Sequence, residues 1–415
     1  MNRYFQQDSK CLIFLHLTKM NSQFATIAFD AKRLFFNQSG LGNYGRTLVS
    51  NLAALYPNNR YLLYSPHLNL SLDDLNQAKA SFKLATNMQL RTPKGLWKTK
   101  FGGSVWRSVL MGNSINSDNP AIFHGLSNEL PFNIGKVKAR KFVTIHDLIF
   151  LRYPQYYPSF DKWVYLKKWK HSCRNADVII AISHQTKEDI IEFLGVHPDK
   201  IQVVYQACNT AYYYDYNDRL FLNHGLFAPL EYQLPPQVPK EYILYVGAIS
   251  ERKNLLTLVK ALHLLKHRLQ IPLVVVGRGK EYEYKVWQYL QEHHLTGQVI
   301  FIPFLPFDDL KAVYRCARAM VYPSIFEGFG LPIIESLFSR TPVITSTGSC
   351  FSEAGGLGTI YVNPLNAEEM ADAIEKVLTD GAQQMEMIMQ GWEYAQQFKA
   401  EPTTTALMKV YGLLG

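Results

Sequence analysis

The stretch Pro323-Ser-Ile-Phe-Glu327-Gly-Phe-Gly-Leu-Pro332-Ile-Ile-Glu335 decides the fold, and it directly follows the apolar run Ala319–Tyr322. A short apolar run of this kind predicts a strand buried on both faces. Gly328 and Gly330 allow the backbone to come close to a ligand, and Pro332 suits the first position of a helix. The stretch therefore predicts a strand, a binding loop and a helix, which together form one unit of a doubly wound α/β domain.

The chemistry of this stretch favours a phosphorylated sugar ligand. The free N–H groups at the predicted helix start carry partial positive charge, which suits a diphosphate. Glu335, predicted in the first helical turn, can accept hydrogen bonds from two hydroxyls of a ribose, and Glu327 in the loop can accept hydroxyls of a sugar. A glutamate that merely complements the helix dipole would explain Glu335, but it would not explain Glu327 among glycines.

The same β/α pattern continues through the C-terminal half. A strand is predicted at Tyr242–Val246, ending at Gly247, and a helix follows from about Asn254 to His267. Further strands are predicted at Leu273–Val276, Val299–Ile302, Ala319–Tyr322 and Pro342–Thr345, and the chain closes with helices predicted near 385–399 and 403–413.

The N-terminal half carries its own β/α series. Strands are predicted at Thr26–Phe29, Tyr61–Tyr64, Phe142–Ile145 and Asp177–Ala181, with helical material such as Lys162–Ser172 between them. Residues 211–240 interrupt the pattern with tyrosines, asparagines and four prolines. We therefore predict an N-terminal extension over residues 1–24, one domain over 25–205, a linker over 206–240, a second domain over 241–391, and a final helix over about 392–415 that packs back on the first domain.

The composition is that of a globular protein with a basic surface. Its 415 residues fit two domains, and 47% hydrophobic with 19% charged residues argues against disorder. The formal net charge of +9 suits an anionic ligand or an anionic surface without choosing between nucleotide, nucleic acid and membrane. Two basic clusters, Lys136–Lys141 and Lys167–Arg174, read either as solvated faces or as a patch for anionic lipid or glycan.

The cysteines and the N-terminus bear on the compartment. Five cysteines without C-x-x-C spacing indicate neither a disulfide framework nor a zinc site, so a reducing compartment is expected. No apolar run approaches the ~20 residues that span a bilayer. The run Cys11–Leu17 is short, contains His16 and lacks a cleavage site, so a signal peptide is not expected, and Met20 is a candidate start.

Glu327 to Glu335 resembles the E-x7-E motif of the retaining glycosyltransferases of the GT-B fold, in the large family four group. Other blocks resemble that family in the same order along most of the chain. They are Ser39-Gly-Leu-Gly-Asn-Tyr44, Val143-Thr-Ile-His146-Asp147-Leu148, Ile180-Ala-Ile-Ser183, Tyr245-Val-Gly-Ala-Ile-Ser-Glu-Arg252-Lys253-Asn254, Val275-Val-Gly-Arg-Gly279, Thr341-Pro-Val-Ile344 and Glu353-Ala-Gly-Gly356. The resemblance implies two Rossmann-like domains facing across a cleft, with the acceptor on the N-terminal side and the donor on the C-terminal side.

The resemblance implies roles for matching positions. Lys253 and Arg252 would hold the donor diphosphate, because cations compensate the charge that grows as the leaving group departs. The alternative is a pair of surface contacts at a helix start. Many family members carry an arginine directly after the strand-end glycine, where this chain has Ala248, so either Arg252 takes over or one phosphate contact is missing. The resemblance also places Gly42, Gly247, Gly277, Phe329, Gly330, Leu331 and Glu335 in the donor site.

Two histidines are candidates for the reacting region. By resemblance, His146 would lie under the transferred sugar and, with Glu327, form the catalytic pair; on its own the His146-Asp147 pair fits a core histidine or a turn equally well. His124 could line the acceptor side, but a structural histidine fits it as well. No DxD triplet occurs, so the usual sequence sign of a metal-dependent donor site is missing and we expect no metal.

Gly40-Leu-Gly42-Asn-Tyr-Gly45 matches the dinucleotide pattern G-x-G-x-x-G but does not fit its context. In a dinucleotide site the glycines open directly after the first strand, and an acidic residue follows about 20 residues later. Here Asp30 ends the strand and residues 55–72 contain no Asp or Glu. We expect instead a loop that closes over the donor phosphates and the acceptor.

The expected reaction is retaining transfer of a hexose from a UDP- or GDP-sugar to a saccharide or lipid-linked saccharide, in cell-envelope polysaccharide synthesis. No cofactor and no nucleic acid are expected. We expect a cytoplasmic enzyme, with peripheral contact at the inner face of an anionic membrane as the alternative to a freely soluble one. Other readings are a sugar phosphorylase or sugar-nucleotide epimerase of the same fold, an oxidoreductase already weakened by the glycine spacing, and a non-catalytic sugar-nucleotide-binding subunit.

Overall fold

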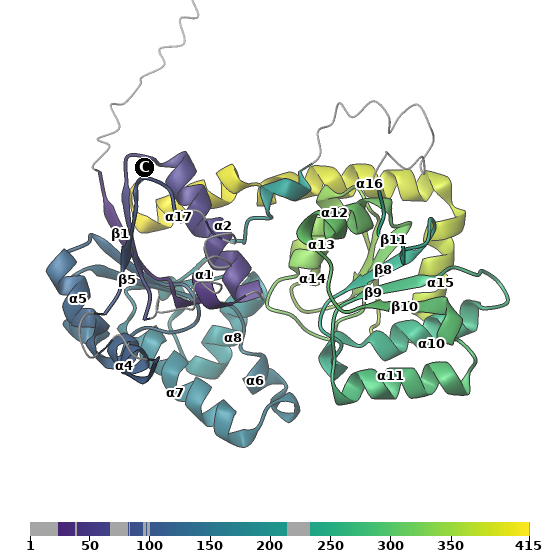
Figure 1. Ribbon diagram of the computed structural model, residues 1–415, viewed down its shortest axis with the longest axis horizontal. Helices are drawn as coiled ribbons and strands as arrows, with labels where there is room; N and C mark the ends of the chain where they lie inside the picture. Colours follow the sequence, from purple (N-terminus) through teal and green to yellow (C-terminus); the bar gives the residue numbers. More distant parts are fainter. Residues whose placement is uncertain are drawn as a thin grey trace, which may run out of the picture.

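The computed structural model describes residues 24–37, 40–66, 84–93, 100–213 and 233–414, together with Phe82 and Trp97. The described chain forms two lobes side by side, each built around a parallel sheet with helices on both faces (Figure 1). The predicted fold class of two doubly wound α/β domains is confirmed.

The N-terminal sheet has the order β3-β2-β1-β4-β5-β6-β7, and all neighbouring strands are parallel. Its strands are β1 (Thr26–Asp30), β2 (Arg60–Tyr64), β3 (Met88–Arg91), β4 (Ile122–Gly125), β5 (Arg140–Ile145), β6 (Val178–Ala181) and β7 (Ile201–Val203). Its helices are α1 (Lys32–Phe36), α2 (Gly40–Leu55), α4 (Lys100–Val105), the π-helix η2 (Trp106–Leu110), α5 (Met111–Asp118), η3 (Ile134–Lys136), α6 (Ile149–Arg152), η4 (Pro154–Tyr156), α7 (Ser159–Asn175), α8 (His184–Leu194), η5 (Pro198–Lys200) and η6 (Thr210–Tyr212).

The C-terminal sheet has the order β10-β9-β8-β11-β12-β13 and is also parallel. Its strands are β8 (Ile243–Val246), β9 (Leu273–Val276), β10 (Val299–Ile302), β11 (Ala319–Tyr322), β12 (Val343–Ser346) and β13 (Thr359–Val362). The helices from here to the end are η7 (Glu251–Lys253), α10 (Leu255–Leu265), α11 (Glu281–Glu292), η8 (Thr296–Gln298), α12 (Phe307–Cys316), α13 (Leu331–Phe338), α14 (Phe351–Gly355), α15 (Ala367–Thr379), α16 (Gly381–Ala395), η9 (Gln396–Phe398) and α17 (Ala400–Tyr411).

Each sheet is buried on both faces, which explains its apolar strands. Successive residues of β1 point to opposite sides, so that Ala28 joins the cluster under α5 and α7 while Ile27 and Phe29 join the one under α2 and α17. In the C-terminal domain, Val275 packs under α10 and Val274 under α13 in the same way. The strands that the sequence did not predict, β3, β4, β7 and β13, are short, and β4 ends in His124 and Gly125.

The strand order reverses between β1 and β4 in one domain and between β8 and β11 in the other. In open parallel sheets, ligands bind beyond the carboxyl ends of the strands at such a point. Segments that follow strand ends of the two sheets face each other, because Gly328 after β11 lies directly against the carbonyl oxygen of His146 after β5, the neighbour of β4. The fold thus brings both binding edges to one interface.

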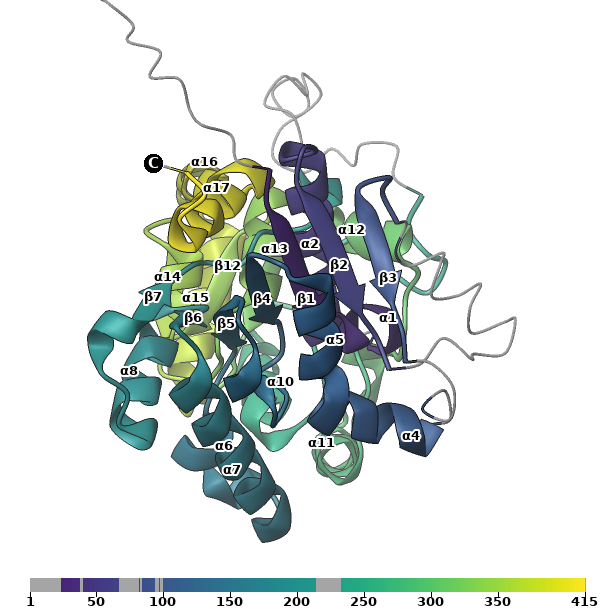
Figure 2. The same ribbon diagram turned by 90° about the vertical axis from the view of Figure 1, so that its left-hand side faces the viewer.

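The chain passes between the domains twice. The last strand of the first sheet ends at Val203 and the first of the second begins at Ile243; between them, residues 214–232 of the predicted linker lie outside the described residues, as do residues 1–23 of the predicted extension. After α16 the chain returns, and α17 lies along α2 in both views (Figures 1 and 2). Met408 of α17 is buried in the N-terminal core.

We expect Met408→Ala to destabilise the N-terminal domain by about 2–5 kcal/mol, because it leaves a cavity in that core. The measurement is urea unfolding combined with hydrogen exchange of β4 and β5. Lys409→Ala, at the neighbouring exposed position, is the control. Unchanged exchange in β4 and β5 of Met408→Ala would contradict this assignment of α17.

Candidate functional site between the domains

The 323–330 loop and α13 form the centre of the site in the C-terminal domain. Gly330 precedes the helix with φ of +134°, a conformation that favours glycine, so the sharp entry into α13 depends on it. The helix begins at Leu331, with Pro332 in its first positions. Its first turn contains no acidic residue, so the prediction that Glu335 lies there was wrong: Glu335 lies one turn further along because the helix begins at Leu331.

Glu335 is nevertheless poised as a hydrogen-bond acceptor. The hydroxyl of Tyr314 on α12 donates to its Oε2 at 2.8 Å. Burial raises the pKa of Glu335 to about 7, although the bond from Tyr314 opposes that shift. An ionised carboxylate here can accept two ribose hydroxyls, whereas the protonated acid loses part of that capacity.

Glu327 lies in a buried group of charges. Its Oε1 is 2.6 Å from Arg252 Nη1 and 2.6 Å from Lys253 Nζ, and it accepts from Ser324 Oγ at 2.5 Å. Burial alone would raise the pKa of Glu327, but Lys253 and Arg252 outweigh it and hold the pKa at about 2. Glu327 is therefore ionised, and the three charges sum to one net positive charge beside the start of α13.

The two cations reach this point from η7. The Arg252 guanidinium also donates to the carbonyl oxygen of Phe326 at 2.5 Å, and the Lys253 ammonium bonds to the Tyr322 hydroxyl. Burial lowers the pKa of Lys253, while Glu327 opposes the shift. An incoming diphosphate can share both cations with Glu327 through charge-assisted hydrogen bonds.

Two glycines keep the neighbouring strand ends free of side chains. Gly247 ends β8 with φ of +151°, and a Cβ there would point toward the Lys253 side chain. Gly277 ends β9 with φ of +156°, and a Cβ on it would lie 1.9 Å from the carbonyl oxygen of Gly247. Both positions require glycine. Because Gly247 has no side chain, the space beside Lys253 stays open.

His146 comes from the N-terminal domain, directly after β5. Its backbone N–H donates to Asn128 Oδ1 at 2.7 Å, and its Nε2 is 2.8 Å from the carbonyl oxygen of Leu126. Because a carbonyl oxygen only accepts, Nε2 carries the proton and Nδ1 is the acceptor, to which Gln206 Nε2 donates at 3.5 Å. Burial lowers the pKa of His146 to about 4, so the ring is neutral at pH 7 and can accept a hydroxyl hydrogen bond.

At the interface of the two domains, the segments that carry the candidate catalytic residues His146 and Glu327 lie next to each other. Gly328, next to Glu327 in sequence, would place a Cβ 2.1 Å from the carbonyl oxygen of His146, so only glycine allows this approach. The rings of Tyr153 and Phe326 lie 5.4 Å apart across the same interface. His146 and the ion group of Glu327 therefore flank the junction of the two domains.

Two predicted site residues have other roles. His124 does not line the acceptor side: it is fully buried, with Nδ1 2.7 Å from the Tyr411 hydroxyl and Nε2 2.8 Å from Thr144 Oγ1. Burial lowers its pKa to about 3, as expected for a neutral structural histidine. Phe329 turns its ring to the interface, where it stacks on Tyr205 with centroids 5.4 Å apart.

The glycine-rich segment at 40–45 is a helix start rather than the predicted loop. Helix α2 begins at Gly40, and Gly42 packs so closely that a Cβ would lie 1.8 Å from the carbonyl oxygen of Asn37. Its N–H donates to Asn37 Oδ1 at 3.3 Å, so Gly42 serves the junction of α1 and α2. Ser39 lies outside the described residues.

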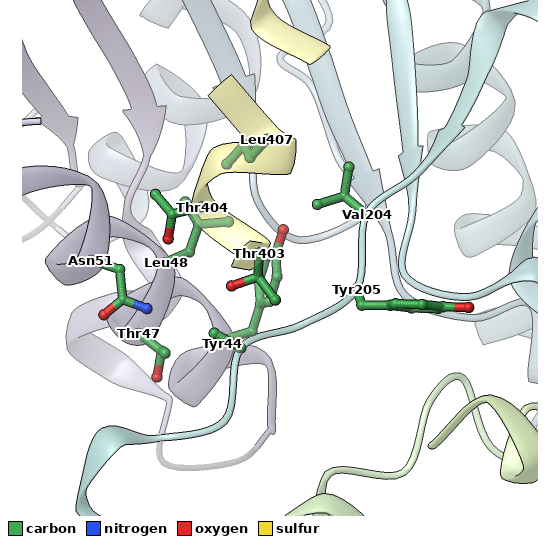
Figure 3. Close-up of a pocket in the computed structure, with 10 residues that line it drawn as sticks. Tyr44, Thr47, Leu48, Asn51, Val204, Tyr205, Thr403, Thr404 and Leu407 are labelled. Atoms are coloured by element: carbon green, nitrogen blue, oxygen red, sulfur yellow. The ribbon is translucent and has the colours of Figure 1, made fainter. Parts of the chain in front are cut away.

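Tyr44 on α2 is a site residue that sequence reasoning missed. Its ring meets the His146 ring edge-on at 4.7 Å, and its hydroxyl is 2.9 Å from Thr144 Oγ1. Beyond it, a small hollow lies between α2 and α17 (Figure 3), lined by Tyr44, Thr47, Asn51, Thr403, Thr404 and Leu407 among others. Val204, Tyr205 and Ala207, which follow β7, complete its lining, and no residue of the 323–330 loop lines it.

Two family models match the chain. One, described as glycosyl transferases group 1, matches residues 231–393, and the other, glycosyltransferase family 4, matches residues 40–212. The chain is 31% identical over 299 residues to O-antigen chain mannosyltransferase B of Escherichia coli, covering 71% of this chain and 74% of that protein. It is 30% identical to O-antigen chain mannosyltransferase RfbU of Salmonella typhimurium, covering 57% and 60%.

Solved structures share the fold. Sucrose-phosphate synthase from Thermosynechococcus elongatus superposes with a TM-score of 0.71 at 21% identity, covering 94% of this chain and 98% of the other. Anabaena HepE in complex with UDP and glucose superposes with a TM-score of 0.67 at 15% identity, covering 94% and 100%. At these identities the likeness concerns the fold alone.

The raised pKa of Glu335 leads to a pH prediction. We expect the affinity for UDP or GDP to fall by up to about tenfold per pH unit below pH 7, because nucleotide binding then has to remove a proton from Glu335. In Glu335→Gln this dependence is lost, while the titration of the phosphates remains common to both proteins. Calorimetry from pH 6 to 8 measures it, and parallel pH profiles would contradict it.

The raised pKa of Glu335 also leads to a prediction for thermal stability, in which Glu335→Gln is more stable than the native chain. Because the pKa is raised from 4.5 to about 7, the contribution of the carboxyl group to stability is present below pH 4.5 and is lost as the pH rises through 7. Glu335→Gln should therefore unfold at a higher temperature than the native chain at pH 8.

Proposed function

Because the chain belongs to the family-four glycosyltransferases of the GT-B fold, we propose that it moves a hexosyl group from a nucleotide-diphosphate sugar to a saccharide or lipid-linked saccharide in cell-envelope polysaccharide synthesis. The O-antigen mannosyltransferases among its relatives favour mannose as the sugar. The UDP complex of one structural neighbour leaves UDP-sugars beside GDP-sugars as donor candidates.

The observation that carries this proposal is the buried ion group of Glu327, Arg252 and Lys253 opposite His146. Two cations beside the start of α13 can hold a diphosphate and stabilise the charge that develops on it as the sugar leaves. Arg252 Nη1 and Lys253 Nζ lie 2.6 Å from the same carboxylate oxygen, which supports the proposal that Arg252 takes over the phosphate contact missing at Ala248. Charge compensation by these groups supports a reaction that needs no metal.

We propose that transfer retains the anomeric configuration without a protein nucleophile. The low pKa of Glu327 and its three bonds make that carboxylate a weak nucleophile, so its role is to orient the sugar. The acceptor oxygen forms the new bond to the anomeric carbon on the face where the bond to phosphate breaks. The leaving phosphate takes the bonding electrons and then the acceptor proton, and His146 positions the sugar through Nδ1.

The test is incubation of the protein with GDP-mannose or UDP-glucose and a lipid-linked saccharide in excess EDTA. We expect transfer with retained configuration, read by NMR of the product. Lys253→Ala should weaken nucleotide binding about ten- to a hundredfold, the usual cost of losing a charged hydrogen bond. Lys285→Ala, an exposed lysine of the same domain, is the matched control.

Several outcomes would overturn the proposal. Formation of an epimerised sugar from the donor without an acceptor indicates an epimerase, and dependence on phosphate with a disaccharide indicates a phosphorylase. Tight nucleotide binding without turnover on any acceptor indicates a non-catalytic subunit. Activity lost in EDTA and restored by Mg²⁺ or Mn²⁺ refutes the metal-independent part alone.

We further propose that the N-terminal domain contacts an anionic membrane through α7. The exposed face of α7 carries Phe160, Trp163, Lys167, Lys170 and Arg174. Phe160 is 72% and Trp163 54% exposed; their rings stack 6.2 Å apart, and Lys167 Nζ lies 3.8 Å from the Trp163 ring centroid. Two aromatic rings followed by a row of cations fit a boundary between acyl chains and anionic headgroups.

The position of α7 agrees with this role. It reaches the lowest part of the molecule in both views (Figures 1 and 2). Among the residues that the structure describes, no helix is long and apolar enough to cross a bilayer. Each cation near anionic lipid contributes about 1 kcal/mol, so a few suffice for reversible attachment.

We expect the protein to sediment with vesicles of phosphatidylglycerol and phosphatidylcholine at low salt and to be released at about 1 M salt, where the Debye length is about 3 Å. Phe160→Ser with Trp163→Ser should reduce the bound fraction more than Phe304→Ser, which removes a 68% exposed ring in the other domain. If the protein ignores the vesicles at low salt, the membrane part fails and the transferase part is unaffected.

A further inference from the structure

Glu353 joins the two domains, although it lies in the block that follows the E-x7-E motif. It belongs to α14 of the C-terminal domain. In the contacts that the described residues show, its carboxylate bonds only to groups of the N-terminal domain. Oε2 accepts from the backbone N–H of His184 at 2.6 Å, and Oε1 accepts from that of Gln185 at 3.0 Å. Both N–H groups are at the start of α8, where the helix dipole strengthens a bond to an anion.

A second set of bonds crosses the interface beside it. Ser183 is the N-cap of α8, and its hydroxyl donates to the carbonyl oxygen of Gly328 at 2.7 Å while accepting from Thr186 N–H at 3.0 Å. Thr186 Oγ1 lies 3.3 Å from that carbonyl oxygen and 3.3 Å from the carbonyl oxygen of His146. Gly328 is the residue after Glu327, so α8 holds the backbone that carries Glu327.

Tyr205 links the two sets. Its hydroxyl lies 3.2 Å from Glu353 Oε2, and its ring stacks on Phe329 with an angle of 16° between the planes. Ser183 and Tyr205 therefore contact the successive residues Gly328 and Phe329, while Glu353 bonds to Tyr205 and to the helix start that follows Ser183. Because Gly328 contacts the His146 carbonyl without room for a side chain, this arrangement exists only when the domains are closed.

We propose that Glu353 and Ser183 form a clasp, defined as these two side chains and their partners on α8 and Gly328, that sets Glu327 against His146 upon domain closure. They act as positioning residues. The catalytic consequence rests on the proposed function, whereas the closure itself does not. Four of the bonds across the interface come from the start of one helix, two from backbone N–H groups and two from the hydroxyls of Ser183 and Thr186. Separating the domains therefore returns them to water together, and the clasp can open and close as a unit.

The clasp explains the use of a carboxylate at this position. An amide would turn its NH2 donors toward one of the two N–H groups of α8, whereas a carboxylate presents an acceptor oxygen to each of them and accepts a hydroxyl as well. The N–H of His184 bonds at the exposed side of the interface. Water competes there, which keeps the closed state reversible, as release of a product requires.

The first test measures closure without relying on activity. Small-angle scattering of the native chain, Glu353→Gln and Ser183→Ala is recorded with and without UDP or GDP. We expect both variants to have a larger radius of gyration with nucleotide present than the native chain, since Gln presents its NH2 donors where Glu353 presents a second acceptor oxygen, and Ala cannot hold Gly328. Glu369→Gln, an exposed first-turn carboxylate of α15, is the control and should match the native chain.

The second test separates positioning from folding. Both variants should bind UDP or GDP within about twofold of the native affinity, because the nucleotide contacts lie in the C-terminal domain, while kcat falls about ten- to a hundredfold and a larger share of donor is hydrolysed. Gly328→Ala should give the same pattern by a steric route, since its Cβ blocks the approach to His146.

The outcomes are distinct. Native scattering and native kcat in Glu353→Gln and Ser183→Ala overturn the clasp. Equal losses of nucleotide affinity and of kcat in these variants also overturn it, because they indicate general damage. If the native chain transfers no sugar at all, the proposed function fails, and the scattering comparison still decides whether the clasp closes the domains.

Discussion

The site depends on one buried carboxylate held by two cations. Glu327 lies at the domain junction with its side chain only 12% exposed, and an isolated charge there would be unfavourable. Arg252 and Lys253, each 2.6 Å away, make its ionised form stable and fix the loop between β11 and α13. The charges of these three residues sum to one positive charge. A ligand with negative charge completes the group, so the stability of the loop and its attraction for a diphosphate have one physical origin.

The two domains contribute different kinds of polar group to the junction, charged on one side and neutral on the other. The C-terminal side offers fixed charges and a helix start, whereas the N-terminal side offers His146, which burial keeps neutral. A neutral acceptor can orient a sugar hydroxyl without disturbing the balance of charge on the other side. Separation of these roles between two domains means that neither domain alone holds a complete site, and that their closure, rather than local folding, assembles it.

The sequence predicted what depends on short-range patterns. Apolar runs located strands such as Leu273–Val276, and the glycines and glutamates at 327–335 located the central loop. It failed where the outcome depends on the exact start of a helix: α2 begins at Gly40 and converts a predicted loop into helix, and α13 begins so that Glu335 leaves the first turn. It could not assign His124, since burial is a property of the assembled sheet. Glu353 was visible only as part of a block, because its partners lie 168 and 169 positions away in the chain.

The double passage of the chain between the domains has a mechanical consequence. The two crossings are bonded to each other: Cys208 N–H donates to the carbonyl oxygen of Phe398 at 2.9 Å, and Ala400 N–H to the Tyr213 hydroxyl at 2.9 Å. They run together along the upper edge of the molecule (Figure 1). A body tied to another at a single point can swing and twist in every direction, but one tied along a line retains a single easy rotation about that line. The second crossing, by α17, therefore leaves the domains one easy motion, a hinge rotation about the line of the two crossings. Each time the domains close by this rotation, the two binding edges meet in the same alignment.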